Sequence, residues 1–173
     1  MIDPEYVRTF AQYNEWQNTQ LLKTMRGLNQ EVLFQERGAY FGSIFATANH
    51  VLWSDQLWMS RFAGFPAPTA NYAKGTEMSS SLEDWAIQRF RLDQAICDWS
   101  NRIKAVDLTG ELSWFSVVNQ REYTRSKGLC VVHMFNHQTH HRGQLHVMLT
   151  AVGCEGATSD LTFMSDAEDC VGP

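Results

Sequence analysis

The feature that most constrains this fold is the proline-free stretch from Ser126 to Gly153, which combines a helical composition with most of the histidines of the chain. Its only interior glycines are Gly128 and Gly143, and Gly153 stands where a helix commonly ends. Five of the six histidines of the protein lie within it: His133, His137, His140, His141 and His146. The stretch therefore predicts one long helix with a dense cluster of side chains that can coordinate a metal.

Helical geometry limits which of these histidines can act together. At about 100° per residue, His137 and His141 lie about 40° and one turn apart, so both imidazoles can reach one ion. Cys130, Met134 and Met148 fall within about 40° of this pair, which makes the stripe largely apolar. We therefore expect His137 and His141 to face the core.

Other histidine pairs remain open on the sequence alone. His133 and His140 are separated by about 10 Å along the helix axis, and His146 lies nearly opposite His137. Two further pairs remain, His133 with His137 and His137 with His140. For each of these histidines, the alternative is an imidazole that hydrogen-bonds within the core and binds no metal.

Length and composition indicate a globular protein. With 173 residues, 44% of them hydrophobic and 12% aromatic, the chain is long enough to bury a core, and we expect a single domain over residues 1–173. The net charge is −5, and only 14 basic residues are scattered along the chain. Nucleic-acid binding needs clustered lysine and arginine, so we expect none here.

The sequence also carries no sign of export or membrane insertion. Residues 1–14 are charged and lack a continuous apolar run, so no secretory signal is expected. No stretch of about 18 apolar residues exists that would span a membrane. The four cysteines are far apart and show no C-x-x-C spacing, which predicts reduced thiols in a cytoplasmic protein: Cys97, Cys130, Cys154 and Cys170.

Three further helices are predicted by capping residues that precede apolar residues at helical spacing. Asp3 followed by Pro4 is a typical helix start, because an aspartate caps the end and a proline suits the first helical position. The three helices run from Pro4 to Met25, from Ser43 to Phe62 and from Ser81 to about Ala105. Together with the histidine-rich stretch they predict an all-α four-helix bundle.

The connections between these helices are long. Residues 29–41 are predicted to be a linker, and residues 64–79 a loop that contains two prolines. Residues 110–127, with Asn119-Gln120 at their middle, predict a small β-hairpin before the last helix. The C-terminal extension, residues 154–173, is acidic and can fold back over the bundle, with a loose end from Asp166 onward.

His50 is the best candidate for a third ligand. On the second predicted helix it shares one face with Ala46, Trp53 and Leu57, within about 60°, so it also projects from an apolar face. Asp55 lies more than about 100° away and is a poor partner for the same ion. A core histidine that bonds to a neighbour is again the alternative.

Facing helices of a bundle can hold a metal in the core, and three imidazoles suit a divalent ion such as zinc or nickel. Three ligands leave a coordination position open, as catalytic sites do. A bound water or thiol at that position loses its proton near neutral pH and becomes a nucleophile. The sequence therefore predicts a metal site that can activate water or a thiol.

The same residues resemble a known family. The run from Asn136 to Gln144 is similar to the N-H-x-x-H-H-R-G-Q signature of the DinB/YfiT-like family of metal-binding bundles. Asn49-His50, with Trp53 and Trp58, resembles the second-helix motif of that family, and Tyr13-Asn14-x-Trp16 resembles its first-helix opening. The resemblance covers most of the chain in the right order.

This resemblance implies a ligand set and a range of activities. The three-histidine site of the family falls on His50, His137 and His141, which leaves His140 to line the site. Gln144 would bond a ligand histidine or a metal-bound water, with surface exposure as the alternative, and Gly143 would allow close helix approach. Some relatives are thiol-dependent S-transferases or isomerases, and relatives often form homodimers.

Several functions therefore remain open. The resemblance implies a metal-dependent S-transferase that joins a low-molecular-weight thiol to a small-molecule substrate, or a related hydrolase or isomerase. The alternative is a non-catalytic module that binds a metal or a ligand. Cys130 is expected to be a core thiol, because it lies about 10 Å from His137 along the helix. Three arginines of the third helix are expected to be solvated: Arg89, Arg91 and Arg102.

Overall fold

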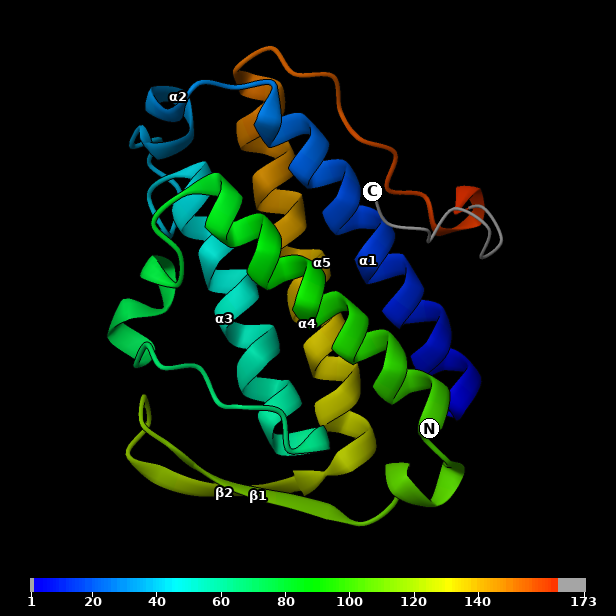
Figure 1. The fold of residues 1–173 in the computed structure, drawn as a ribbon. Coiled ribbons are helices and arrows are strands. Elements are labelled where there is room, and N and C mark those ends of the chain that lie inside the picture. The colour runs from blue at the N-terminus through cyan, green and yellow to red at the C-terminus, as the bar shows by residue number, and fades with distance from the viewer. Residues whose placement is uncertain (1, 165–173) are drawn as a thin grey trace.

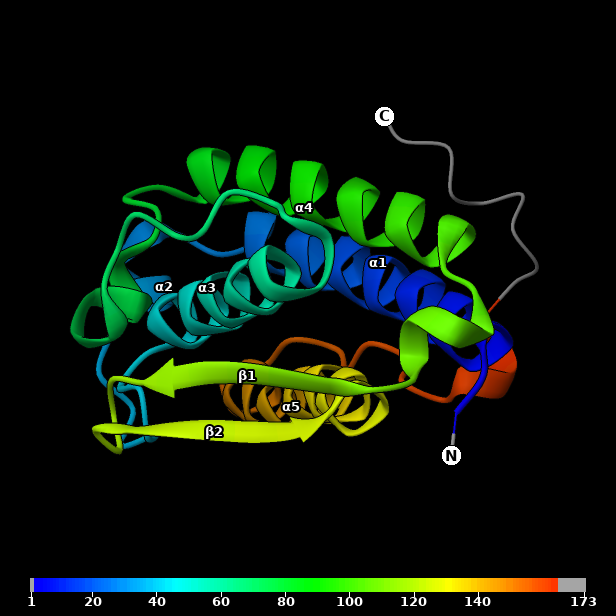
Figure 2. The same ribbon diagram turned by 90° about the horizontal axis from the view of Figure 1, so that it is seen from below.

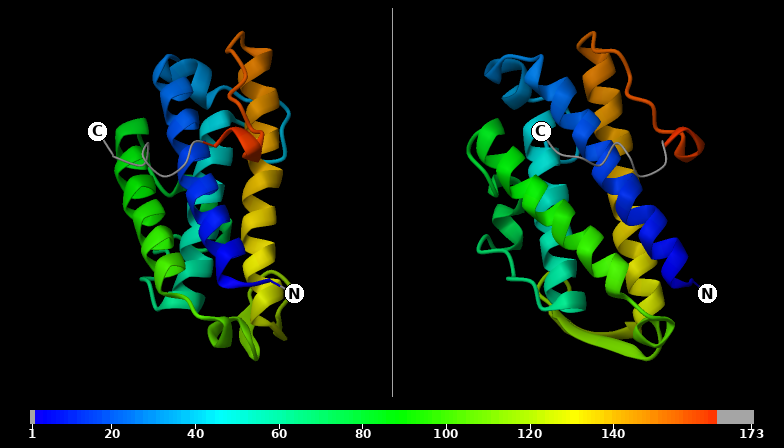
Figure 3. Two further views of the ribbon diagram at one scale, coloured as in Figure 1. Left: turned by 90° about the vertical axis from the view of Figure 1, so that its right-hand side faces the viewer. Right: turned by 45° about the vertical axis from the view of Figure 1, so that its right-hand side comes forward.

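The computed structural model describes residues 2–164, which form a bundle of four long helices (Figure 1). These helices are α1 (Pro4–Arg26), α3 (Ile44–Ala63), α4 (Leu82–Arg102) and α5 (Lys127–Ala151). α1 packs against α4 and α5, and α3 packs against the same two helices. Figure 3 shows the bundle from two further directions. The predicted four-helix bundle is confirmed.

Three of the long helices begin at the predicted capping residues. Asp3 accepts a hydrogen bond from the Tyr6 amide at 2.8 Å. Ser43 accepts one from the amide of residue 46 at 3.1 Å, and Ser81 accepts one from the amide of residue 84 at 3.2 Å. α4 ends at Arg102, slightly before the predicted end, and α5 begins at Lys127. The capping residues therefore mark the helix starts more closely than any residue marks the helix ends.

The connections are more ordered than predicted. The linker prediction for residues 29–41 is wrong in part, because it contains a short helix, α2 (Gln30–Phe34), capped by Asn29. The loop over residues 64–79 contains a 3₁₀ helix, η1 (Tyr72–Glu77), which packs against α3. A Cβ atom on Gly75 would lie only 3.1 Å from the Trp53 ring, so a glycine is needed for this close approach.

The predicted hairpin is present and crosses the end of the bundle where α5 begins (Figure 2). β1 (Glu111–Ser116) pairs with β2 (Arg121–Ser126) in antiparallel register, with Trp114 opposite Tyr123. A further 3₁₀ helix, η2 (Ala105–Leu108), links α4 to β1. The Trp114 ring also meets the edge of the Trp58 ring at 5.5 Å, which attaches the hairpin to α3. The hairpin thereby closes one end of the bundle.

The C-terminal extension folds back along α1. Gln17 donates to the Thr158 carbonyl at 2.7 Å, and the Tyr13 hydroxyl donates to the Ser159 carbonyl. The chain then forms a short turn of 3₁₀ helix, η3 (Leu161–Phe163). The predicted loose end from Asp166, with Cys170, lies outside the described residues. No helix within residues 2–164 is long and apolar enough to cross a membrane.

The bundle core is mostly apolar, with a chain of buried polar side chains running through it. The largest fully buried side chains include Trp85, Phe45, Phe135, Met25 and Ile44. Arg89 was predicted to be solvated, and this is wrong, because its guanidinium is buried and pairs with Asp55 and Asp93 at 2.7 Å each. The polar chain includes residues from all four long helices: Asn14 and Asn18, Asp55, Arg89 and Asp93, and Gln138 and Arg142.

Candidate metal centre

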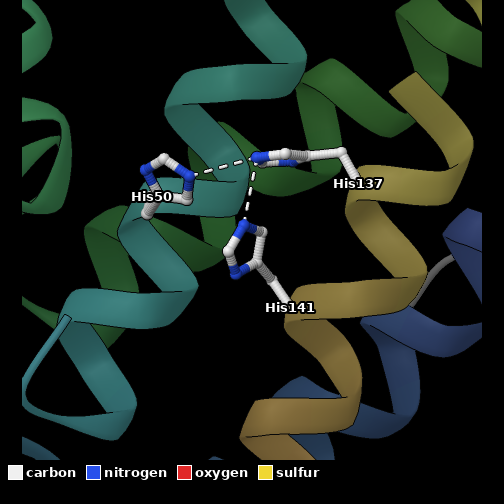
Figure 4. A group of neighbouring side chains, drawn as sticks. All are labelled: His50, His137 and His141. Atoms are coloured by element: carbon white, nitrogen blue, oxygen red, sulfur yellow. Dashed lines mark hydrogen bonds between the residues drawn. The ribbon is translucent and has the colours of Figure 1, made fainter. Parts of the chain in front are cut away.

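Three histidines from two facing helices meet at one point between α3 and α5. The Nε2 atom of His137 lies 3.2 Å from Nε2 of His50 and 3.1 Å from Nε2 of His141. One ligand atom from each ring fits within a group no wider than 4.8 Å. Figure 4 shows the three rings with these nitrogens turned toward one another. The structure thus brings together the three residues selected from the sequence, and such a group can hold a metal ion.

The helices turn these rings inward because both carry an apolar stripe on that side. Cys130, Met134 and Met148 are buried on the same side of α5, as expected. His50 is 8% exposed and His141 is 7% exposed, while His137 is half-buried. The neighbouring Asn49 is bonded to the backbone and hydroxyl of Ser79, which fixes the η1 segment against α3. The histidines therefore project from helices that are held by buried contacts, into a region that is largely shielded from solvent.

The other histidines of α5 do not join this group. His133 is exposed, and its ring packs against Trp58 with centroids 5.2 Å apart. His140 is also exposed, with its ring centroid 4.8 Å from that of His141. His146 is exposed and packs against Gly156 in the C-terminal extension. Within the described part of the chain, the histidine group that could hold a metal therefore includes neither His133 nor His140. The alternative pairs, His133 with His137 and His137 with His140, do not form the site.

Burial makes the three imidazoles neutral at physiological pH. It lowers the pKa of His137 to about 3, and the positive charge that the neighbouring histidines would carry adds to the shift. Burial and the nearby His141 lower the pKa of His50 to about 4. The pKa of His141 is also lowered by burial. Neutral imidazoles offer the lone pairs that metal ligands need.

The imidazole protons cannot form hydrogen bonds across both of the short nitrogen–nitrogen contacts, His50 to His137 and His137 to His141. The amide oxygen of Gln144 lies 2.8 Å from Nδ1 of His141, so the proton of that ring belongs on Nδ1 and its Nε2 carries a lone pair. Nε2 of His137 faces a nitrogen on each side, and one N–H can serve only one of them. At least one of the two contacts is therefore not a hydrogen bond, and a cation between the three nitrogens would give each of them a partner.

The spacing of the nitrogens also suits a tetrahedral ion. Zinc binds imidazole nitrogen at about 2.0–2.1 Å, which separates two ligands of a tetrahedral site by about 3.3–3.4 Å. The separations of His137 Nε2 from the Nε2 atoms of His141 and His50, 3.1 and 3.2 Å, are close to this value. The residues present therefore fit a divalent metal with three nitrogen ligands.

Gln144 and His140 lie at the edge of the group. Besides its bond to His141, the Gln144 amide nitrogen lies 3.3 Å from Nε2 of His140. Gln144 thus connects the buried ring to an exposed one and orients the His141 ring. Gly143 does not allow a close helix approach, because nothing lies within 4 Å of a Cβ atom built there. That expectation is wrong, since this part of α5 faces outward.

An aromatic wall beside His50 was not predicted. Phe41 stacks on the His50 ring with centroids 3.9 Å apart, and its centroid lies 5.4 Å from that of His141. Trp53 flanks His50 from one helical turn away, at 6.2 Å, and in turn meets Tyr72 of η1. Phe41 lies in a segment without helical periodicity, so only its position just before the Ser43 cap could have signalled it. This wall limits the access of water to His50.

No described acidic side chain belongs to the histidine group, and the buried Asp55 is engaged elsewhere. Its carboxylate accepts hydrogen bonds from Gln138 at 2.9 Å and from Arg89 at 2.7 Å. The expectation that Asp55 is a poor partner for the same ion agrees with this placement. Gln138 follows His137 directly in α5, so the polar chain of the core and the histidine group lie on adjoining faces of one helix.

Comparisons with known proteins agree with the fold and with the sequence resemblance. The sequence model of the DinB family matches residues 1–170. The protein DinB of Bacillus subtilis (strain 168) is 25% identical over 168 residues, which cover 91% of this chain and 94% of that protein. A crystal structure of a DinB-like protein from Bacillus cereus ATCC 10987 aligns with a TM-score of 0.62 at 20% identity, covering 86% of this chain and 94% of that one. At this identity the structural likeness shows a shared fold alone.

Proposed function

The chain belongs to the DinB family, and we propose that His50, His137 and His141 bind a divalent zinc or nickel ion that serves an S-transferase or related reaction. The observation that carries this proposal is the convergence of three neutral Nε2 atoms from α3 and α5. With three protein ligands, a coordination position stays open for a thiol or water. A divalent ion bound there lowers the pKa of that thiol or water and supplies a nucleophile near neutral pH.

The residues of the chain supply orientation and a dry environment. Gln144 holds the proton of His141 on Nδ1, so that Nε2 presents its lone pair. Phe41 and Trp53 cover the His50 ring and keep water from its faces. In the proposed reaction, the sulfur of a low-molecular-weight thiol forms a bond to an electrophilic atom of a small substrate. The leaving group departs with its bonding electrons, and the thiol proton passes to solvent.

A second candidate function is a non-catalytic module in which occupancy by a metal or ligand is the signal. It is favoured by the lack of an acidic residue in the histidine group within the described part of the chain, because Asp55 is held by Arg89 and Gln138. A general base other than histidine is then missing. For both candidate functions we propose a cytoplasmic protein. We also propose that the chain forms a homodimer, as relatives in the family often do.

The first test is metal content by elemental analysis of wild-type protein that carries no metal-binding tag. We expect about one zinc or nickel ion per chain, lost in His50→Ala, His137→Ala and His141→Ala. His146→Ala is the matched control, because that histidine lies on α5 outside the group, and it should keep its metal. A folded wild type that contains no metal and refuses added zinc and nickel would refute the proposal.

The second test separates the enzyme from the binding module. Metal-loaded protein is incubated with a low-molecular-weight thiol, such as cysteine or glutathione, and with 1-chloro-2,4-dinitrobenzene, and the thioether product is measured. Product formation above that of His137→Ala supports the transferase. Thiol binding to the metal-loaded protein without any product, for these and other electrophiles, supports the module.

A further inference from the structure

A cavity lies at one end of the bundle, where α3 and α4 end and α5 begins. The hairpin covers this end of the bundle (Figure 2). Its volume is about 290 Å³, which is near the lower limit for small-molecule sites. The side chains that matter for its chemistry come from all three helices: Arg61 and Phe62, Trp99 and Arg102, and Lys127 and Val131. The cavity is therefore built by elements that are far apart in the sequence.

This cavity is separate from the candidate metal centre. None of the three clustered histidines lines it. Val131, its nearest lining residue on α5, precedes His137 by six residues, which is about 9 Å along the helix. A ligand in this cavity would thus bind without touching the ion.

The charge around the cavity is opposite to that of the whole protein. The chain has a net charge of −5, yet Arg61, Arg102 and Lys127 line the cavity with only Asp107 as an acidic neighbour. Three cations against one anion leave a local charge of +2. Within residues 2–164, none of these three cations forms an ion pair, and the Asp107 carboxylate accepts a hydrogen bond from the backbone of Lys104. The positive charge is therefore available to a ligand.

Arg61 is held in place while its polar edge stays free. Its guanidinium lies over the Trp58 ring at 4.6 Å and over the Trp114 ring at 5.2 Å. Stacking on aromatic faces orients a guanidinium but leaves its N–H groups, which lie in its plane, able to donate. A planar carboxylate can accept two such hydrogen bonds at once.

The remaining walls are apolar. Phe62 and Trp99 stack with ring centroids 5.6 Å apart and planes only 9° from parallel. Ile103 and Leu108, both 8% exposed, form the adjoining wall. Such a surface accepts an aromatic ring or a short acyl chain and rejects a fully polar ion.

The start of α5 adds a further attraction for an anion. The side chain of Ser126 makes no capping hydrogen bond, and the first turn of α5 contains no acidic residue. The positive end of the helix dipole therefore lies on the cationic side of the cavity, where Lys127 is the first residue of α5.

From these features together we propose that this cavity binds a small amphipathic carboxylate, with an aryl or short acyl body against the stacked rings of Phe62 and Trp99 and its carboxylate at Arg61 and Lys127. This ligand site goes beyond the proposed metal function and does not depend on it. The apolar walls supply affinity, and the unpaired cations select the anion.

The test is calorimetric titration of the full-length protein with 3-phenylpropanoate and, as its neutral counterpart, 3-phenylpropanamide. We expect the carboxylate to bind roughly tenfold more tightly, since a hydrogen bond to a charged group contributes about that factor. Arg61→Gln and Lys127→Gln should each weaken carboxylate binding about tenfold and leave amide binding unchanged. Lys127→Gln is included because Arg61 also packs on two tryptophans.

Two controls make the result specific to this cavity. Arg91→Gln removes an exposed cation from α4 and should bind the carboxylate as wild type does. Wild-type protein in excess chelator, and His137→Ala, should also keep the wild-type affinity, because the ligand does not use the metal centre. Equal binding of acid and amide, unchanged affinity in both cavity variants, or loss of binding with chelator would each overturn the proposal.

Discussion

The buried arginine of α4 offers the sharpest test of how the core is held together. Arg89 pairs with Asp55 and with Asp93 at 2.7 Å each, and the three side chains are 3%, 1% and 5% exposed. One cation therefore compensates two buried carboxylates on different helices. Arg89→Met keeps much of the side-chain volume and removes the charge, so it leaves both carboxylates without their cation.

The expected loss of stability is large. Removing one partner of a buried ion pair destabilises a protein by about 3–5 kcal/mol, because the other charge stays buried and uncompensated. Two carboxylates depend on Arg89, so we expect the upper end, about 5 kcal/mol. With an m-value of about 2 kcal/mol per molar, this lowers the urea midpoint by about 2.5 M. Total stabilities are about 5–15 kcal/mol, so the variant is expected to be marginal.

The loss should also depend on pH. Burial raises the pKa of Asp93 to about 7, against the opposing attraction of Arg89. A raised carboxyl pKa means that the native state binds the proton more tightly than the unfolded state. Stability is then lost as pH rises from about 4, the ordinary pKa, towards 7. Without Arg89 the pKa rises further, so Arg89→Met should be more destabilised at pH 8 than at pH 6.

The assay is urea denaturation followed by tryptophan fluorescence at both pH values. Arg91→Met, an exposed arginine of the same helix, is the control and should change stability by less than about 0.5 kcal/mol. Adding Asp55→Asn and Asp93→Asn to Arg89→Met should recover at least half of the loss, because neither carboxylate is then left buried without its arginine. A loss below about 1 kcal/mol for Arg89→Met, with no pH dependence, would refute this account of the core.

Two further predictions test individual contacts. Gln144→Leu removes the hydrogen-bond partner of His141 Nδ1. It should weaken metal binding about 10- to 100-fold, measured by competition with a chelator. Wild-type metal affinity in this variant would mean that the contact does not orient the His141 ring. Gly75→Ala places a Cβ atom 3.1 Å from the Trp53 ring and should cost about 1–3 kcal/mol in urea denaturation. Gly143→Ala, which meets nothing within 4 Å inside a helix, should instead stabilise by about 0.5–1 kcal/mol, and equal effects of the two substitutions would contradict the packing argument.

The sequence predicted most of the fold because its signals were local. Asp3, Ser43 and Ser81 each cap the helix that follows them, and a capping residue needs only its own amide neighbours to act. The hairpin was predicted for the same reason, from the pair Asn119-Gln120 at the middle of its segment. The short helix α2 was missed because five residues are too few to show helical periodicity.

The candidate site was predicted only in part. His137 and His141 share a helix, so their spacing fixed their relation, and His50 could be added because it projects from the apolar face of its own helix. Arg89 was misjudged because its partner Asp55 lies on another helix and is recognised only when the bundle closes, while Asp93, four residues along the same helix, suits an exposed pair equally well. Phe41 was missed because a loop residue has no periodicity to orient it.

The polar chain of the core explains how the three histidines can be held in place without an acidic ligand among them. Gln138 ties α5 to Asp55 of α3 at 2.9 Å, and it directly follows His137. The bond therefore fixes the rotation and height of α5 against α3 at the point where their rings must meet. A one-residue shift of α5 would turn it by about 100° and move it by about 1.5 Å, which would separate His137 from His50. Asp55 thus helps to position the candidate metal centre through its hydrogen bond to Gln138, although it contributes no ligand.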